Sequence, residues 1–337
     1  MSERSVFAPT RETASHLIER FRLGPGTGRL SPVARGAMGR IWRLSVAGRG
    51  YAVKELFWGA DESAVRREVA FRDTAAEAGV VSPANLPSED GRYVCVLPPE
   101  LGGVAVRMFS WIEGLTAHHD DAGLQPWMGR TLGVLHSLRY PFGGVTPDPW
   151  YDRTPPVTRW DEWVEQAEAT GQPWAAPLAK LTPLLRSLAT HVVPVDPSNL
   201  IYNHLDLQPQ NVMVEPSGRY VLLDWEDAGP GMPDRVLANL LVNRTIHEGA
   251  FDAARAHEVL DAYRRAGGYA ALTGLDSFSG NLAGYLNYLD AQASVSLDTN
   301  QAVDMRDHAT GELLGCLADP PRLDLFREVL KGVQPAG

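Results

Sequence analysis

The sequence is poor in cysteine, and this shortage excludes a class of protein. Its 337 residues include two cysteines, Cys95 and Cys316, which are too few and too far apart for the disulfide framework of a secreted domain. The first residues are polar, and no run of about 18 apolar residues occurs, so we expect neither a signal peptide nor a membrane-spanning segment. Such cysteine usage fits a reduced, cytoplasmic setting.

Positive charge is also in the minority. The chain has 31 Lys and Arg against 41 Asp and Glu, which gives a net charge of −10. No basic stripe compensates for the charge of a nucleic-acid backbone, so we expect no nucleic-acid partner. An acidic protein can attract a cationic substrate, but solubility alone also accounts for this charge.

Lysine is the scarcest charged residue, with only Lys54, Lys180 and Lys331 present. Lys180 and Lys331 lie in polar stretches with a helical pattern. Lys54 lies inside the apolar segment 52–56 (Ala-Val-Lys-Glu-Leu), where a charged side chain needs a partner. Lys54 is therefore a candidate functional residue.

The apolar pattern divides the chain into a sheet-rich part and a helical part. Up to Gly114 we expect helices at 12–23 and from Asp61 to about Gly79, a β-hairpin at 40–57, and strands at 92–97 and 104–111. Beyond it we expect helices at 128–138, 160–169, 173–190 and from 235 onward, with short strands at 200–203, 212–215 and 220–225. This order predicts an α+β protein in which a small sheet precedes a mostly helical part.

Two segments carry the chemistry of phosphoryl transfer: Asn-His-Leu-Asp-Leu-Gln-Pro-Gln-Asn at 203–211 and Leu-Leu-Asp-Trp-Glu-Asp at 222–227. Asp206 precedes Asn211 by five residues and Asp224 by eighteen. An Asp on such a loop can accept the proton of an attacking hydroxyl, while an Asn and a second Asp hold Mg²⁺ against phosphates. A polar hairpin with turn hydrogen bonds explains each residue singly, but not the whole set at this spacing.

Lys54 and Glu68 form a second candidate pair. A strand lysine that binds phosphates is commonly oriented by a helix carboxylate, and Glu68 borders the apolar face of the helix that follows Asp61. The alternative is two unrelated surface charges. Gly36 and Gly39 precede the hairpin, where they fit either a loop over phosphates or a plain turn.

These segments follow one another in the order of a known family: AVKEL at 52–56, FSWIEG at 109–114, LGVLHSL at 132–138, HLDLQPQN at 204–211 and LLDWEDAG at 222–229. From about 32 to 241 the chain resembles the aminoglycoside phosphotransferase and choline kinase superfamily. The resemblance implies a bilobal, protein-kinase-like fold with a five-stranded antiparallel N-lobe sheet, one N-lobe helix, a mostly helical C-lobe and ATP in the cleft. The implied parts are an N-terminal helical segment (1–25), a phosphate-binding N-lobe (26–109), a hinge (110–114) and a C-lobe (115–337).

The resemblance also implies roles for individual residues. Asp206 would be the catalytic base, Asn211 and Asp224 the Mg²⁺ ligands, and His204 a scaffold for the loop. ATP, with GTP as an alternative donor, would contact Lys54, Glu68, Gly36, Gly39, and the main chain of Ser110 and Ile112. Four positions depart from the family pattern: Leu205 replaces a Gly, Gln208 a His, and Met232 and Val236 each an Asp.

Acidic and aromatic residues are candidates for the acceptor site. A cationic amino sugar could pair with carboxylates and stack on a tryptophan. A solvated helix face and a core tryptophan explain the helical candidates equally well. The candidates are Glu226, Asp227, Asp161, Glu165 and Trp160.

The run His118-His119-Asp120-Asp121 is the other cluster that suggests a ligand. Its spacing is not that of a metal site, so a loop and a helix cap are the better interpretation.

Three functions remain open. The first is a kinase that phosphorylates a hydroxyl of an aminoglycoside-like or other natural-product antibiotic. The second is a metabolic kinase for an amino sugar, a choline-like alcohol or a similar metabolite. The third is a nucleotide-binding pseudokinase, which the departures at Leu205, Gln208 and Met232 suggest. The presence of Lys54, Asp206, Asn211 and Asp224 opposes it. We expect a monomer or a homodimer.

Overall fold

The computed structural model describes residues 7–36 and 39–334. The chain folds into two compact units. The first contains the described residues up to Asp120 together with Gln208–Asp227, and the second contains Asp121–Leu207 and the described residues from Ala228 onward. The expected glycine loop lies only partly within the described residues, because 37 and 38 are outside them.

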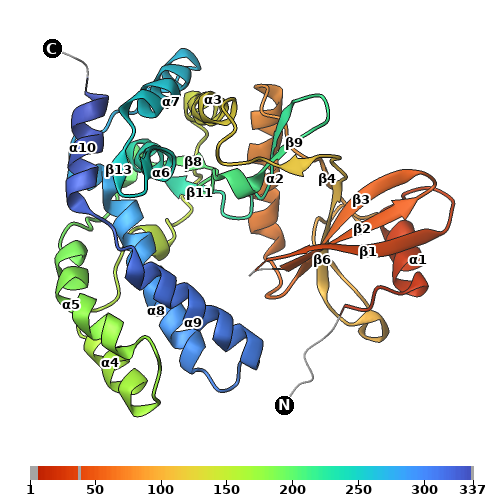
Figure 1. Cartoon of the computed structure of the whole chain (residues 1–337). Helices are drawn as coiled ribbons and strands as arrows, with labels where there is room; N and C mark the ends of the chain where they lie inside the picture. The colour runs from red at the N-terminus through yellow and green to blue at the C-terminus, as the bar shows by residue number, and fades with distance from the viewer. Residues whose placement is uncertain (1–6, 37–38, 335–337) are drawn as a thin grey trace. The chain divides into compact units, whose positions relative to one another are not determined.

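An antiparallel sheet forms most of the first unit (Figure 1). Its strands follow the order β1-β2-β3-β6-β4, and β5 also pairs with β6. The helices α1 and α2 belong to the same unit. The elements are α1 (Arg11–Arg20), β1 (Gly28–Arg35), β2 (Gly39–Val46), β3 (Arg49–Leu56), α2 (Glu62–Glu77), β4 (Asn85–Leu86), β5 (Cys95–Val96) and β6 (Ala105–Ser110).

The sheet has six strands among the described residues, where the resemblance implied five. The difference lies at one edge of β6. There β4 pairs with Met108 and Phe109, and β5 pairs with Ala105 and Val106. The two short strands therefore lie along successive halves of β6 and together occupy the place of one interrupted edge strand.

Alternating side chains of the sheet build the core of this unit. Trp42, Leu44 and Val46 of β2 are buried on one face, where they join Leu17 and Ile18 of α1. Residues two apart on a strand point to the same face, so this alternation gives β2 one buried face and one more exposed face. The hairpin of β2 and β3 is the one expected from the sequence.

A second, three-stranded sheet completes the first unit. Its order is β10-β9-β7, and it contains β7 (Leu115–Thr116), β9 (Val212–Val214) and β10 (Tyr220–Leu222). The sequence analysis assigns 208–227 to the C-lobe. In the structure this segment clusters with the first unit, because β9 pairs with β7 and the Leu222 amide donates to the Val81 carbonyl.

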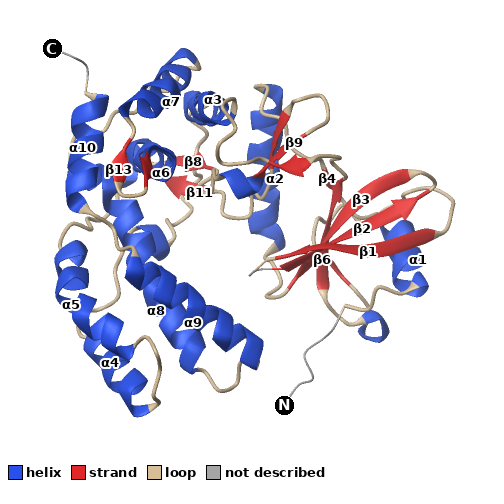
Figure 2. Cartoon of the chain, viewed as in Figure 1, coloured by secondary structure: helices blue, strands red, loops and turns tan. Residues whose placement is uncertain are grey.

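The second unit consists mainly of helices, which Figure 2 colours blue. Helix α3 packs closely on α7 because two glycines face it. A methyl group on Gly129 would lie 2.2 Å from the Val259 carbonyl oxygen, and one on Gly133 would lie 2.3 Å from that of Tyr263. The helices are α3 (Leu124–Ser137), α4 (Arg159–Ala169), α5 (Ala175–Ala189), α6 (Pro233–Thr245), α7 (Ala253–Arg265), α8 (Ser279–Leu297), α9 (Val303–Ala318) and α10 (Leu323–Val333).

Short strands connect these helices in two pairs. Strand β8 (Ile201–Asn203) pairs with β11 (Gly229–Gly231), and β12 (Ile246–His247) pairs with β13 (Ala250–Phe251). In the part of the chain that the structure describes, no helix combines the length and hydropathy needed to cross a membrane.

Candidate functional site

Lys54 lies on β3, and its ammonium group contacts two carboxylates of the first unit. The Lys54 Nζ atom is 2.9 Å from Asp224 Oδ1 and 2.7 Å from Glu226 Oε2. Burial by itself would lower the pKa of Lys54, but the charges of Glu226 and Asp224 outweigh it, and the pKa is raised. Lys54 is therefore held as a cation against the acidic segment that follows β10.

Glu68 points into the first unit, but its partner is not Lys54. Its two carboxylate oxygens accept hydrogen bonds of 2.7 and 2.8 Å from the guanidinium of Arg107 on β6. Burial raises the pKa of Glu68 even though the bonds from Arg107 oppose this shift. The expected Lys54–Glu68 contact is thus replaced by a Glu68–Arg107 pair, because a guanidinium matches a carboxylate through two parallel bonds.

Arg107 is the site residue that sequence reasoning missed. Only 2% of its side chain is exposed, and it also donates to Asn85 Oδ1. The signal was present in the sequence, because Arg107 is a charged residue inside the apolar segment 104–111, as Lys54 is in its own strand. The same argument that singled out Lys54 therefore applies to Arg107.

Asp224 adopts a left-handed backbone conformation, with φ = 52°. Aspartate is one of the few residues that tolerate this region, which turns the chain sharply after β10. Trp225, the next residue, holds the turn in place through two contacts. Its ring packs edge-on against Phe71 of α2 at 5.5 Å between centroids, and its Nε1 donates to Ser82 Oγ.

Asn211 ends a short 3-10 helix, Pro209–Asn211, and lies directly before β9. Its side chain is buried, and its carbonyl accepts a hydrogen bond from the Leu223 amide. This bond ties the segment before β9 to the segment after β10, so Asn211 and the turn at Asp224 belong to the same ribbon of the first unit.

Asp206 lies near the end of a stretch of the second unit, two residues before the chain enters the first unit. The buried ring of His204 accepts a 3.3 Å hydrogen bond at Nδ1 from the Asp206 amide. Between them, Leu205 has φ = 64°, a left-handed conformation that costs a branched residue about 1 kcal/mol. The family glycine expected here would adopt this conformation without strain.

Two of the four departures border one glycine. A methyl group on Gly231 would lie 2.8 Å from Leu205 Cδ2 and 3.3 Å from Val236 Cγ2. The third departure, Met232, is the N-cap of α6 and makes no side-chain cap hydrogen bond. Val236 thus makes an apolar contact near Gly231 where the family pattern has an aspartate, and Leu205 makes one where the pattern has a glycine. The fourth departure, Gln208, accepts a bond from Gln210.

The proposed hinge residues and glycines differ in whether their backbone groups are already hydrogen-bonded within the protein. The Ser110 amide donates to the Ala84 carbonyl, so this donor is already used within the sheet. Gly39 is buried, and a methyl group there would lie 2.2 Å from the Glu55 carbonyl oxygen, which explains the need for glycine. The Gly36 amide donates to the Gly39 carbonyl and closes the turn, whereas Ile112 is half-buried.

The acceptor candidates belong to both units, with Trp160, Asp161 and Glu165 in the second and Glu226 and Asp227 in the first. Trp160 is only 1% exposed and belongs to the core, so it does not present a ring to a ligand. Asp161 is exposed and pairs with Arg186, and Glu165 is exposed. Of the remaining candidates, Glu226 contacts Lys54, and Asp227 is exposed. The charges in the sequence 160–169 thus belong to a solvated helix face.

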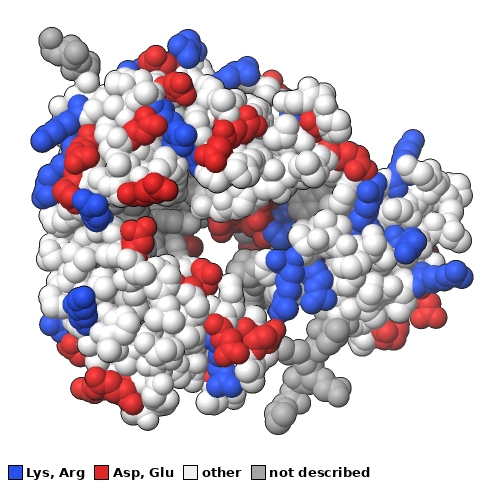
Figure 3. Space-filling model, in the orientation of Figure 1, with Lys and Arg blue, Asp and Glu red and all other residues white. Residues whose placement is uncertain are grey.

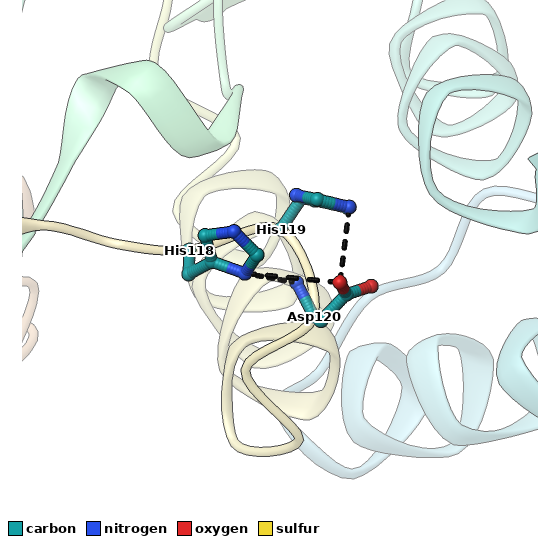
Figure 4. Close-up of side chains that lie close together, drawn as sticks. All are labelled: His118, His119 and Asp120. Carbon is teal, nitrogen blue, oxygen red and sulfur yellow. Dashed lines mark hydrogen bonds and ion pairs between the residues drawn. The ribbon is translucent and has the colours of Figure 1, made fainter.

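His118, His119 and Asp120 form an exposed cluster on the loop before α3 (Figure 4). The His119 Nε2 atom is 3.1 Å from Asp120 Oδ2, and the His118 Nδ1 atom accepts a hydrogen bond from the Asp120 amide. The next residue, Asp121, accepts a bond from the Gly123 amide where α3 begins. These contacts join residues that are at most two positions apart in the sequence, which is typical of a loop that leads into a helix.

Charged side chains of both signs are interspersed on the face that Figure 3 shows. This agrees with the composition, in which acidic residues exceed basic ones by ten, from 41 against 31.

The fold resembles that of several solved kinases. A spectinomycin phosphotransferase in complex with ADP and spectinomycin aligns with a TM-score of 0.63 and 12% identity, covering 95% of this chain and 98% of the other. A microcompartment-associated aminopropanol kinase aligns with a TM-score of 0.62 and 17% identity, covering 96% and 98%. An amicoumacin kinase in complex with AMP-PNP and Ca²⁺ aligns with a TM-score of 0.53 and 16% identity, covering 84% and 87%.

These structures confirm the kinase-like α+β fold. None of the curated proteins matches the sequence. Residues 29–275, more than half of the chain, match the phosphotransferase enzyme family. The resemblance that the sequence indicates is thereby confirmed, and this chain belongs to the phosphotransferase enzyme family.

Proposed function

We propose that the protein is an ATP- and Mg²⁺-dependent kinase that phosphorylates a hydroxyl group of a small molecule. The observation that carries this proposal is the ammonium of Lys54 on a strand, in contact with the carboxylates of Asp224 and Glu226. A cation for phosphates and oxygen ligands for a metal ion are what phosphoryl transfer requires from a protein. Both belong to the first unit.

The donor groups suit a magnesium ion. Mg²⁺ prefers hard oxygen ligands, which Asp224 supplies as a carboxylate and Asn211 as an amide. The bond from the Leu223 amide to the Asn211 carbonyl keeps the two residues in one ribbon. When bound, the ion would neutralise charge on the phosphates, and Lys54 would exchange its contact with Asp224 for one with phosphate oxygens.

Asp206 is our candidate for the base that receives the proton of the acceptor hydroxyl. The His204 ring accepts a bond from the Asp206 amide, which orients the main chain at the proposed base. Leu205, directly before Asp206, has a left-handed backbone conformation. Such a conformation persists only where surrounding contacts determine it, so the backbone beside Asp206 is well defined.

The remaining nucleotide contacts follow from the lobes that we propose: 26–109 for the phosphates, 110–114 as the hinge and 115–337 for the acceptor, after a helical segment at 1–25. The Ser110 amide is used by Ala84, so Ile112 is the better main-chain partner for the adenine. Gly36 and Gly39 would border the phosphates.

The acceptor that we propose is a hydroxylated natural product of the aminoglycoside type. The spectinomycin phosphotransferase supports this class, since its structure covers almost the whole chain. The aminopropanol kinase, with a similar TM-score, supports the alternative of a metabolic amino alcohol. Both classes combine an amine with a hydroxyl, which agrees with the negative net charge of −10.

The first experiment is an assay of Mg²⁺-dependent ADP release from ATP across aminoglycosides, amino sugars, choline-like alcohols and other hydroxylated natural products. Asp206→Asn is the matched variant, because it keeps the size of the side chain and removes the base. We expect release that depends on one acceptor class and falls by about 10²- to 10⁴-fold in Asp206→Asn. ATP binding without turnover would favour the pseudokinase, and absence of ATP binding would refute the proposal.

A further inference from the structure

Two cations lie opposite each other on neighbouring strands of the first unit. Lys54 on β3 is in register with Arg107 on β6. Residues directly opposite in a sheet share one face, and like charges in this position repel each other. The two side chains are only 12% and 2% exposed, so water screens this repulsion weakly. Carboxylates must therefore lie between them.

Two carboxylates provide the compensating charge, and they are distributed unequally. Glu68 binds Arg107 through both oxygens, at 2.7 and 2.8 Å. Glu226 divides its oxygens, with Oε2 at 2.7 Å from Lys54 Nζ and Oε1 at 3.5 Å from Arg107 Nη1. Glu226 is thus shared between the two cations, whereas Glu68 is fully engaged by Arg107.

We infer that Arg107 is a positioning residue for Lys54. Arg107 keeps Glu68 away from Lys54 and holds the second oxygen of Glu226. The ammonium of Lys54 is thereby left to Asp224 and Glu226, which are residues of the acidic segment after β10. The catalytic meaning of this arrangement depends on the proposed function, in which Lys54 binds phosphates. The positioning of the Lys54 side chain by Arg107 does not depend on the proposed function.

Removal of Arg107 alone would leave the buried carboxylate of Glu68 without its partner. The charge of Lys54 already acts on Glu68, so Lys54 would turn toward α2. A single substitution also risks unfolding, because one member of a buried pair would be left unpaired. The informative variant is therefore Arg107→Met/Glu68→Leu, which removes both members of the pair and retains Glu226.

The first test uses the small number of lysines and needs no nucleotide. An amine-directed reagent is applied to the whole protein, and mass spectrometry compares the labelling rate of Lys54 with those of Lys180 and Lys331. We expect Lys54 to react about tenfold more slowly in Arg107→Met/Glu68→Leu than in the wild type, because Glu226 would no longer be shared with Arg107 and would hold the proton on the Lys54 ammonium more firmly. An unchanged ratio of rates would overturn the inference.

Two further variants separate positioning from general stability. Arg107→Lys keeps the charge but cannot bind Glu68 through two parallel bonds, so its Lys54 labelling should be intermediate. Leu44→Ala is the destabilised control, since Leu44 is a fully buried core residue on β2. Its melting temperature should fall while the labelling ratio stays at the wild-type value. A ratio that follows the melting temperature across all variants would contradict a positioning role.

The second test measures ATP. Arg107→Met/Glu68→Leu should raise the KM for ATP about tenfold, equivalent to about 1.4 kcal/mol, with a smaller change in kcat. Equal KM values for the folded double variant and the wild type would overturn the inference. A wild type that binds no ATP would instead refute the proposed function, and the labelling result would still decide the role of Arg107.

Discussion

At the residue scale, two non-glycine residues adopt left-handed backbone in the segments that the sequence marked as chemical. They are Leu205 and Asp224, with φ = 64° and 52°. Such conformations persist only where surrounding contacts determine them, and they are frequent at functional sites. Trp225 supplies such contacts after Asp224, and Gly231 borders the side chain of Leu205. A Cβ at position 231 would lie 2.8 Å from Leu205 Cδ2, so the present position of the Leu205 side chain depends on glycine there.

The fit between Leu205 and Gly231 leads to a testable prediction. In Gly231→Ala the new methyl group would lie 2.8 Å from Leu205 Cδ2, so the Leu205 side chain next to Asp206 must move. A small displacement of a proposed base can cost about 10²-fold in rate. We therefore expect Gly231→Ala to reduce acceptor-dependent ADP release by about 10- to 100-fold.

A second substitution checks this explanation. Leu205→Ala removes the clashing carbons, so Leu205→Ala/Gly231→Ala should be more active than the sum of the two single effects predicts. Gly311→Ala is the matched control, because a methyl group there meets no other atom within 4 Å. Strictly additive effects would show that the contact with Leu205 is not the cause.

At the element scale, the local sequence pattern predicted those helices and strands whose position depends on local apolar periodicity. The hairpin of β2 and β3, α2 and the helices α3 to α5 lie where the apolar periodicity indicates them. The expected strand 92–97 shortens to β5, and β1 was not predicted at all, since five of its eight residues are exposed and give little apolar signal. The exchange of Lys54 for Arg107 as the partner of Glu68 depends on strand register, which no local pattern reveals.

The contact of α3 with α7 contains a buried histidine. The Nδ1 atom of His136 is 2.8 Å from the hydroxyl of Tyr263, which in turn accepts a bond from the Ala270 amide. Burial lowers the pKa of His136 from 6.5 to about 3. The folded protein therefore keeps this ring neutral at pH values where the unfolded chain protonates it.

The lowered pKa of His136 predicts how stability depends on pH. Above pH 6.5 the residue contributes no pH dependence, and as the pH falls from 6.5 toward 3 the unfolded state gains a proton that the folded state does not. The free energy of unfolding should then fall by roughly 1.4 kcal/mol per pH unit from this group. Urea unfolding of the wild type and His136→Gln at about pH 7 and about pH 5 measures it.

The glutamine variant should lose less stability than the wild type over this interval, whatever its stability at neutral pH. His119→Gln is the control for the substitution itself, because His119 is exposed. Identical pH dependence in the wild type and His136→Gln would contradict a neutral buried ring.

At the scale of the whole molecule, the compact units of the structure divide the chain differently from the proposed lobes. The pairing of β7 with β9 joins residues about a hundred positions apart and draws Gln208–Asp227 into the first unit. Long-range pairing of this kind leaves no periodic signal. Chain order alone therefore placed this segment with the helices, and the roles of its motif residues stay a prediction.

The division of roles between the units predicts two separable phenotypes. MgATP at about a hundred times its dissociation constant should stabilise the wild type by about 2.7 kcal/mol, a rise of a few degrees in melting temperature. Lys54→Met should abolish this rise, because its ammonium is our proposed phosphate ligand. Asp206→Asn should retain the rise and lose turnover. A variant pair with the opposite behaviour would contradict the assigned roles.

The interrupted first unit also has a consequence for how the protein is made on the ribosome. Among the described residues β7 pairs only with β9, and residues 121–207 separate them. A nascent chain that has emerged to Asp120 therefore lacks the ribbon that carries Asp224 and Glu226, so Arg107 and Lys54 would meet without those two carboxylates. Synthesis must deliver much of the second unit before the first can neutralise its own buried charges, which makes this stretch of translation the period of greatest exposure to misfolding.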